Sequence, residues 1–210
     1  MSPMAADLVR TIDDPVNPLI SNLLDGLDAL EGLDFSENRK TCPYGLITSE
    51  KQLELLVNEN RLHPEVFGLK NYEFQLAGTI NYGPIRFRND TTQSEGLRDD
   101  LIRQLMGRVR VGLGLRGKDI FWVATTEYGY ENRIHTHFLV GIAGRALVPT
   151  AALTQATDRA FTSLSAHFNE SQLGTLHLNK VTNPLGAISY LCKEEYRRPM
   201  KHFIFSKTII

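Results

Sequence analysis

The sequence predicts an α+β protein in which helices cover an antiparallel β-sheet. Two observations predict this class. From residue 71 onward, two kinds of segment follow one another along the chain. Short segments with alternating apolar side chains predict strands, and longer segments whose apolar residues recur every three or four positions predict helices. The order of these segments is β-α-β-β-α-β-α, and split β-α-β units of this kind imply an antiparallel sheet with helices packed on it.

The region before this pattern differs in composition, so we divide the chain into two parts. Residues 1–70 hold 12 Asp and Glu against 6 Lys and Arg, whereas residues 71–210 hold 12 against 17. In the first part, the leucine-rich stretch 19–33 predicts one or two short amphipathic helices. Residues 50–59 predict another, because a Thr-Ser pair suited to capping precedes them. We therefore expect an acidic, mostly helical N-terminal extension ahead of the main domain.

The main domain is predicted to contain four strands, each rich in β-branched and aromatic residues. They are the segments 72–82, 119–129, 133–142 and 174–181. Three helices are predicted between and after them, the last opening with Asn183 as its cap and Pro184 at its first position. These helices are the segments 94–114, 149–168 and 183–198. The expected architecture is a ferredoxin-like or RRM-like antiparallel sheet.

The bulk properties exclude several classes of protein. There is no run of about 18 apolar residues, so no membrane span is expected. The start MSPMAADLVR lacks the basic and apolar segments of a secretory signal. Cys42 and Cys192 are too few for a disulfide framework or a cysteine-based zinc site. We expect an intracellular protein, and the mildly basic main domain permits a nucleic-acid partner.

The stretch TTEYGYENRIHTHFLVGI carries the first candidate site. Period-two alternation places His135 and His137 on one face of their strand. A hairpin centred near Glu131 would put Glu127 directly opposite His135, with Cβ atoms roughly 5 Å apart. Two imidazoles and a carboxylate suit Mg²⁺, Mn²⁺ or Zn²⁺. The alternative is that the histidines line a half-solvated face, and a one-residue change of register would remove Glu127 from the set.

The last predicted helix carries a second candidate pair. Tyr190 and Lys193 are three residues apart and therefore share a helix face. An ammonium favours ionisation of a nearby phenol, and a phenolate can attack phosphorus. Taken alone, this spacing favours a tyrosine packed on the sheet beside a solvated lysine.

The motifs taken together resemble the HUH endonuclease superfamily, and within it the rolling-circle replication initiator (Rep) proteins of small viruses and plasmids. LAGTINY resembles the first family motif, RIHTHFLVGI the second and AISYLCKE the third. The resemblance covers residues 71–200 in order and leaves the N-terminal third unexplained. One departure is Thr136, which stands between the histidines where the family has a bulky apolar residue; being β-branched, it still suits a strand.

The resemblance implies a metal-dependent endonuclease that nicks and joins single-stranded DNA. His135 and His137, with Glu127 as third ligand, would hold Mg²⁺ or Mn²⁺. Tyr190 would form a covalent 5′-phosphotyrosine and Lys193 would stabilise developing charge. The implied partners are single-stranded DNA at a replication origin and host replication proteins, while the oligomeric state stays open. Side chains expected to line the DNA groove are Asn81, Arg86, Arg88, Lys180 and Arg197.

Two residues and two rival functions remain open at this point. Tyr196 lies about 240° around the helix from Tyr190, so a single nucleophile is expected. His177 is either a supporting polar group or an ordinary half-exposed side chain. One rival is a non-catalytic nucleic-acid-binding module, which would need exposed aromatic residues such as Phe121 on its central strands. The other is a metal-dependent phosphodiesterase that acts on a small phosphoester and does not need the tyrosine.

Overall fold

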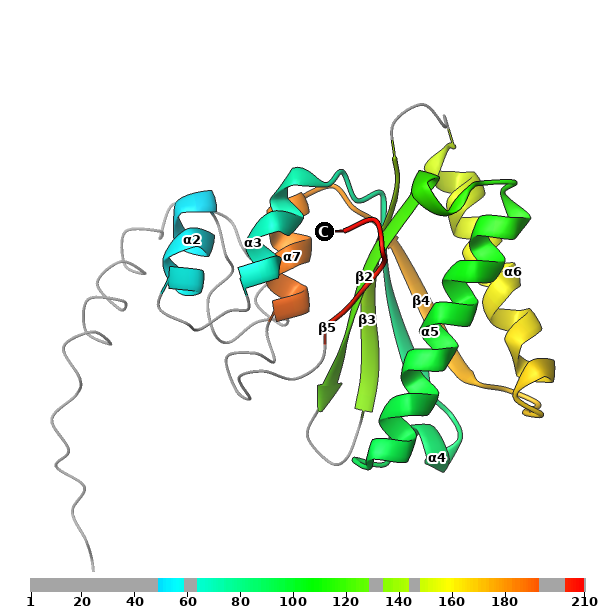
Figure 1. The fold of residues 1–210 in the computed structure, drawn as a ribbon. Coiled ribbons are helices and arrows are strands. Elements are labelled where there is room, and N and C mark those ends of the chain that lie inside the picture. The colour runs from blue at the N-terminus through cyan, green and yellow to red at the C-terminus, as the bar shows by residue number, and fades with distance from the viewer. Residues whose placement is uncertain (1–48, 59–63, 129–133, 144–147, 193–202, 210) are drawn as a thin grey trace, which may run out of the picture. The chain divides into compact units, whose positions relative to one another are not determined.

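The computed structural model describes residues 49–58, 64–128, 134–143, 148–192 and 203–209. These residues form a sheet of five strands in the order β4-β1-β3-β2-β5 (Figure 1). Every pair of neighbouring strands is antiparallel, which confirms the predicted fold class. The strands are β1 (Leu76–Tyr82), β2 (Ile120–Tyr128), β3 (Ile134–Ile142), β4 (Gly174–Lys180) and β5 (Phe203–Phe205).

Helices lie on both sides of this sheet (Figure 1). They are α2 (Glu50–Asn58), α3 (Pro64–Gly68), α4 (Ile85–Arg88), α5 (Thr92–Gly112), α6 (Thr150–His167) and α7 (Pro184–Cys192). Two short 3-10 turns, η1 (Leu69–Asn71) and η2 (Gly117–Asp119), complete the described elements. No helix in the described part of the chain combines the length and the apolar character needed to cross a bilayer.

The two faces of the sheet build two separate apolar cores, because alternate side chains of a strand point to opposite faces. On one face, Phe138 and Val140 of β3 pack with apolar side chains of α4, α5 and α6. On the other, Leu139 of β3 packs with Phe121 of β2 and with residues of α3, η1 and α7, including Ile188. The second face is the one to which alternation assigns His135 and His137.

Three of the described helices, α2, α5 and α7, begin with a side-chain cap. The Ser49 hydroxyl accepts a hydrogen bond from the Gln52 amide at 3.2 Å at the start of α2. Thr91 accepts one from the Ser94 amide at 3.2 Å at the start of α5, although that helix was predicted to begin at residue 94. Asn183 caps α7 as predicted, since its side-chain oxygen accepts from the Gly186 amide at 3.0 Å.

All the strands and long helices predicted for the main domain are confirmed within the described residues. The short elements α3, α4, η1, η2 and β5 were not predicted. Each is at most five residues long, too short to display a helical or strand period. The helices expected in residues 19–33 lie outside the described residues.

Residues 50–58 and 64–70, which the sequence assigns to the N-terminal extension, contribute to the core of the main domain. Leu53 of α2, Val66 of α3 and Leu69 of η1 are each 0% exposed. They belong to the same apolar cluster as Phe121 of β2. The compact unit that contains the sheet begins at Tyr44, whereas the division at residue 70 stays a prediction.

Candidate active site

The β2–β3 pairing brings the predicted acidic residue to the histidines. In the observed register Glu127 lies opposite His135, and Thr125 lies opposite His137. This is the pairing that the hairpin predicts; the turn residues 129–133 themselves lie outside the described residues. Glu127 and His137 are therefore diagonal neighbours on one face, a separation that a long side chain can span.

His137 is the centre of the site. It is buried, with 3% of its surface exposed, and its Nε2 lies 2.6 Å from Oε2 of Glu127. Its Nδ1 lies 2.8 Å from the Thr79 hydroxyl of the neighbouring strand β1, since the register places Thr79 opposite His137. Both ring nitrogens thus have a polar partner, and the two partners together hold the ring in one orientation.

Helix α7 places the predicted nucleophile against this histidine. The rings of Tyr190 and His137 meet edge to face, with centroids 4.7 Å apart and planes at 75°. The flanking side chains Ile188 and Leu191 are buried in the core beneath α7, which fixes the helix on the sheet. Tyr190 itself is only partly buried, so its position combines contact with the site and access from solvent.

His135 lies at the edge of the same cluster. Its ring centroid is 5.9 Å from that of His137, and it is partly buried. In the described part of the chain, no three His, Cys, Asp or Glu side chains are arranged as a set that could hold a metal ion. His137 and Glu127 instead share a direct hydrogen bond. The donor types still fit a divalent cation, because two imidazole nitrogens and one carboxylate are suitable ligands once a cation replaces that hydrogen bond.

The residue between the histidines points to the opposite face and is held there by hydrogen bonds. Thr136 is 1% exposed; its hydroxyl bonds to the hydroxyl of Tyr82 and lies 3.3 Å from that of Thr126. Burial raises the pKa of Tyr82, so this phenol keeps its proton. A bulky apolar residue could not satisfy the two buried hydroxyls, which explains why threonine occupies this position.

The remaining predicted residues occupy different positions in the structure. Asn81 lies opposite His135, next to the site, and its side chain donates to the Thr175 hydroxyl at 3.4 Å. Arg86 forms an ion pair with Glu170 at 3.0 Å and donates to the Phe168 carbonyl at 2.6 Å, just after the end of α6. Residues outside the described part of the chain are Lys193, Tyr196 and Arg197.

The basic residues Arg88 and Lys180 are exposed but do not lie on the histidine face. Arg88 belongs to α4, whose Phe87 packs into the core on the other face. Lys180 is two residues after Leu178 in β4, so the two side chains point to the same face of the sheet. Leu178 packs against the core on the face opposite to the histidines. His177 of β4, by contrast, lies opposite Thr79 of β1. Its side chain therefore points to the same face of the sheet as His137, with β1 between the two strands.

The main residue that the sequence reading missed is Thr79. In LAGTINY, Thr79 is a partly buried residue between two buried ones. Any strand with one half-buried face shows this pattern, so the pattern is only a weak sign of a functional residue. Its importance depends on β1 being the neighbour of β3, and no local pattern reveals which strands pair.

Known proteins show little similarity to this chain. No protein-family model matches the chain, and no curated protein matches it. Among solved structures, it is similar to the N-terminal nuclease domain of the non-structural protein 1 of minute virus of mice. The identity is 12%, the match covers 69% of this chain and 73% of that chain, and the TM-score is 0.33. That protein is described as having Zn²⁺ coordination in its active-site pocket and as recognising DNA at the origin of replication.

Proposed function

We propose that the protein nicks and rejoins single-stranded DNA at a replication origin through a covalent bond between Tyr190 and the 5′-phosphate. The observation that supports this most is the edge-to-face contact between Tyr190 and His137, a histidine that also contacts Glu127. The contact brings the proposed nucleophile next to a proposed metal ligand from a distant part of the sequence. A spacing in the sequence could not show this convergence.

In the proposed step the Tyr190 oxygen attacks phosphorus and the bond from phosphorus to the 3′-oxygen breaks. The phenol loses one proton and the departing 3′-oxygen gains one, so the reaction conserves charge and needs no ATP. Attack by a 3′-hydroxyl on the phosphotyrosine reverses the step and joins two strands. Such a cycle would start rolling-circle replication.

The surrounding residues have distinct proposed roles. A divalent cation held by His135, His137 and Glu127 would polarise the phosphate and neutralise its charge. Thr79 keeps the His137 ring oriented through its hydrogen bond to Nδ1. Lys193, three residues after Tyr190, is proposed to stabilise negative charge on the phenol or the phosphate.

Binding of the DNA strand needs contacts beyond the reacting groups. Asn81, which lies opposite His135, is the described residue best placed to touch a strand at the site. Arg88, Lys180 and Arg197 remain proposed phosphate contacts at a greater distance, whereas Arg86 has a structural partner in Glu170. Host replication proteins and an intracellular setting belong to the same proposal.

The two rival functions are less well supported by the described residues. A binding module of the RRM type needs exposed aromatic rings on its sheet, but Phe121 is only 5% exposed and lies under the second core. A hydrolase of small phosphoesters would use the histidines and Glu127, but it gives no reason for Tyr190 to contact His137.

The proposal is tested by incubating the full chain with a pool of single-stranded oligonucleotides and Mn²⁺ or Mg²⁺. A covalent adduct that migrates slowly on a denaturing gel is expected, and EDTA should prevent its formation. A binding module would give no adduct, and a small-phosphoester hydrolase would turn over substrate without one; either result would contradict the proposal.

Replacement of Thr79 tests the positioning role of its hydroxyl. Thr79→Val should lower Mn²⁺ affinity and the rate of adduct formation by roughly 10- to 100-fold, as expected for loss of a partner that orients a ligating histidine. Thr79→Ser should retain both, because it keeps the hydroxyl. Isothermal titration calorimetry measures the affinity independently of activity.

Thr162→Val is the matched control, because Thr162 is an exposed residue of α6 that bonds only to the Asp158 carbonyl within the described structure. It should change neither quantity. Equal losses in Thr79→Val and Thr79→Ser would show that the hydroxyl is not what matters at this position.

A further inference from the structure

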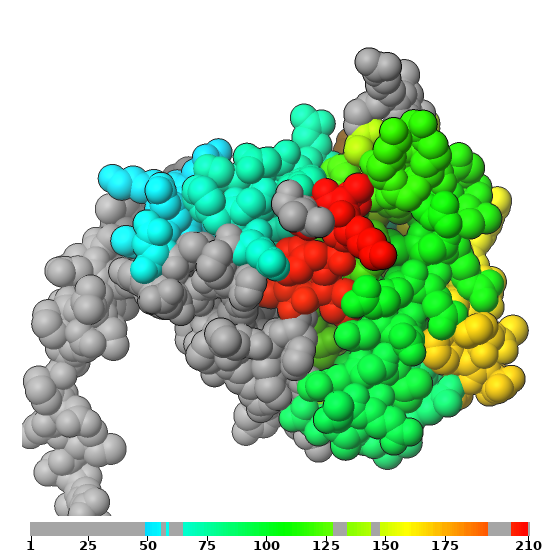
Figure 2. All heavy atoms as spheres, viewed as in Figure 1, coloured from blue at the N-terminus to red at the C-terminus, as the bar shows by residue number. Residues whose placement is uncertain are grey.

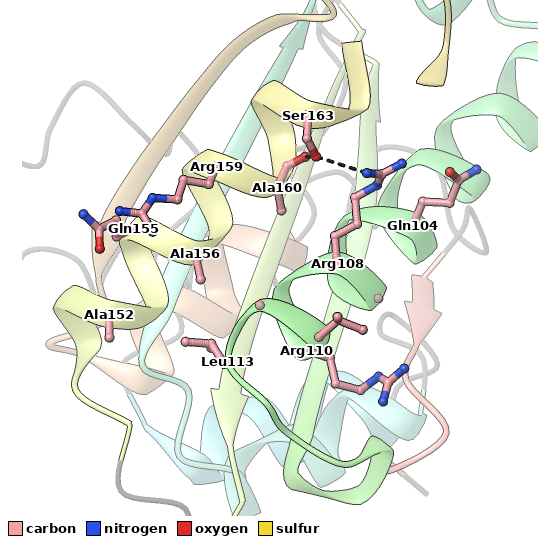
Figure 3. Close-up of a pocket in the computed structure, with 13 residues that line it drawn as sticks. Gln104, Arg108, Arg110, Leu113, Ala152, Gln155, Ala156, Arg159, Ala160 and Ser163 are labelled. Carbon is pink, nitrogen blue, oxygen red and sulfur yellow. Dashed lines mark hydrogen bonds between the residues drawn. The ribbon is translucent and has the colours of Figure 1, made fainter. Parts of the chain in front are cut away.

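Two hollows lie on either side of helix α5, on the face of the sheet opposite to His137. The first, of about 860 Å³, lies between α5 and α6 (Figure 3). The second, of about 560 Å³, lies between α5 and the segment that begins with β5. Both are bordered by Gly107 and Arg110. In Figure 2, α5 (green) is exposed between α6 (yellow) and the C-terminal segment (red).

The charged side chains around these hollows all carry the same sign. Among the described residues that line them there is no Asp or Glu. No ion pair between described residues involves any of the lining cations. Asp119, next to Lys118 in the sequence, pairs with Arg116 at 2.9 Å. Asp158, next to Arg159, does not line either hollow. The lining cations are Arg103, Arg108, Arg110, Lys118, Arg159 and Lys207.

The first hollow combines these charges with small side chains. Gly107, Ala156 and Ala160 line it, so the backbone of a bound molecule can approach α5 and α6 closely. Arg108 extends from α5 toward α6 and donates to the Ser163 hydroxyl at 3.2 Å (Figure 3). One hydrogen bond uses only part of a guanidinium, which has five N–H donors. Arg108 is thus held at the rim with donors left for a ligand.

We propose that α5 and the two hollows bind the phosphate backbone of duplex DNA. Arginine forks match phosphate oxygens, and a one-signed patch without carboxylates complements a polyanion. Sites for single strands combine charge with aromatic rings on which bases stack. Of the described residues that line the first hollow, none is aromatic. At the second, Trp122 is only 8% exposed and the ring of Phe205 stacks on Phe203 with centroids 5.8 Å apart. Among their described residues, neither hollow thus offers a free ring on which a base could stack, so this surface suits a duplex whose bases are already stacked.

This inference rests on the proposed function, because it gives the nicking site a second contact with the same DNA. The duplex surface and Tyr190 lie on opposite faces of the sheet. Phosphates bound at α5 would therefore raise the local concentration of the DNA at the site without taking part in the chemistry.

The test measures binding of a random-sequence duplex of about 20 base pairs to the full chain by fluorescence anisotropy over a range of salt concentrations. The double variant Arg108→Gln with Arg159→Gln should lower the slope of log affinity against log salt by about 2, because each phosphate contact contributes about 0.9. Arg108→Lys with Arg159→Lys should retain the slope, since the charge remains. Thermal unfolding confirms that each variant is folded.

The control is Lys51→Gln with Lys70→Gln, which removes two positive charges from α2 and η1 and should leave duplex binding unchanged. Absence of duplex binding by the unaltered chain, a larger effect of the two arginine-to-glutamine substitutions on a single strand of equal length than on the duplex, or an equal loss in the control would each overturn the inference. Adduct formation is scored separately on the unaltered chain. Loss of the adduct with intact arginine-dependent duplex binding contradicts only the nicking proposal, and the reverse result contradicts only the duplex surface.

Discussion

Tyr190→Phe is expected to abolish the covalent protein–DNA adduct, with a loss of about 10³-fold or more, because phenylalanine has no oxygen with which to attack phosphorus. The variant keeps the ring that contacts His137 edge to face, so its stability should change little. The measurement is the fraction of labelled oligonucleotide retained by the protein on a denaturing gel. Circular dichroism melting then separates chemical loss from unfolding.

Two further tyrosine variants make this result specific. Tyr72→Phe removes a hydroxyl that donates to the Thr208 carbonyl at 3.3 Å and should leave the adduct unchanged. Tyr196→Phe should also leave it unchanged, because Tyr196 is six residues beyond Tyr190 and would face another side of a continuous helix. An adduct that persists in Tyr190→Phe and disappears in Tyr196→Phe would identify Tyr196 as the nucleophile.

The part of the site that could be predicted from sequence is the part formed by neighbouring strands. Glu127 and His135 belong to strands joined by a short connection, so their pairing followed from the centre of one turn and is observed. Alternation likewise placed His137 on the face of His135. These inferences need only the two-residue period of a strand and the geometry of a hairpin.

The rest of the site depends on long-range packing, which the local sequence does not reveal. Thr79 contacts His137 because β1 pairs with β3, although α4, α5, η2 and β2 lie between these two strands in the sequence. The spacing of Tyr190 and Lys193 alone favoured an ordinary packed tyrosine; the family resemblance suggested a role for Tyr190, and the structure supplies its contact with His137. The cations around α5 also come from separated segments, so their common sign appears only after folding.

The direct hydrogen bond between His137 and Glu127 has a consequence for metal binding. A cation must displace this 2.6 Å contact to reach both donors, so occupation of the site competes with an existing interaction. Glu127→Gln keeps an acceptor for His137 but removes the negative charge. We therefore expect Glu127→Gln to weaken Mn²⁺ binding while the protein remains folded, and isothermal titration calorimetry measures the change.

His137→Ala is expected to have the larger effect, since it removes a proposed ligand and the ring that contacts Tyr190. Adduct formation should fall by about 10³-fold, which corresponds to the several kcal/mol that a metal contributes to stabilising charge in the transition state. His135→Ala provides a second test if the buried His137 proves necessary for folding, because His135 is only partly buried. Both variants should weaken Mn²⁺ binding measured directly.

His167→Ala is the matched control, because His167 is an exposed residue of α6 whose ring contacts Phe168. It should retain both Mn²⁺ affinity and adduct formation. A folded His135→Ala variant with unchanged Mn²⁺ affinity would exclude His135 as a ligand. If adduct formation by the unaltered chain also resisted EDTA, His137 and Glu127 would act on Tyr190 through hydrogen bonding and orientation alone, and the chemistry would then depend on the same two contacts that the structure already shows.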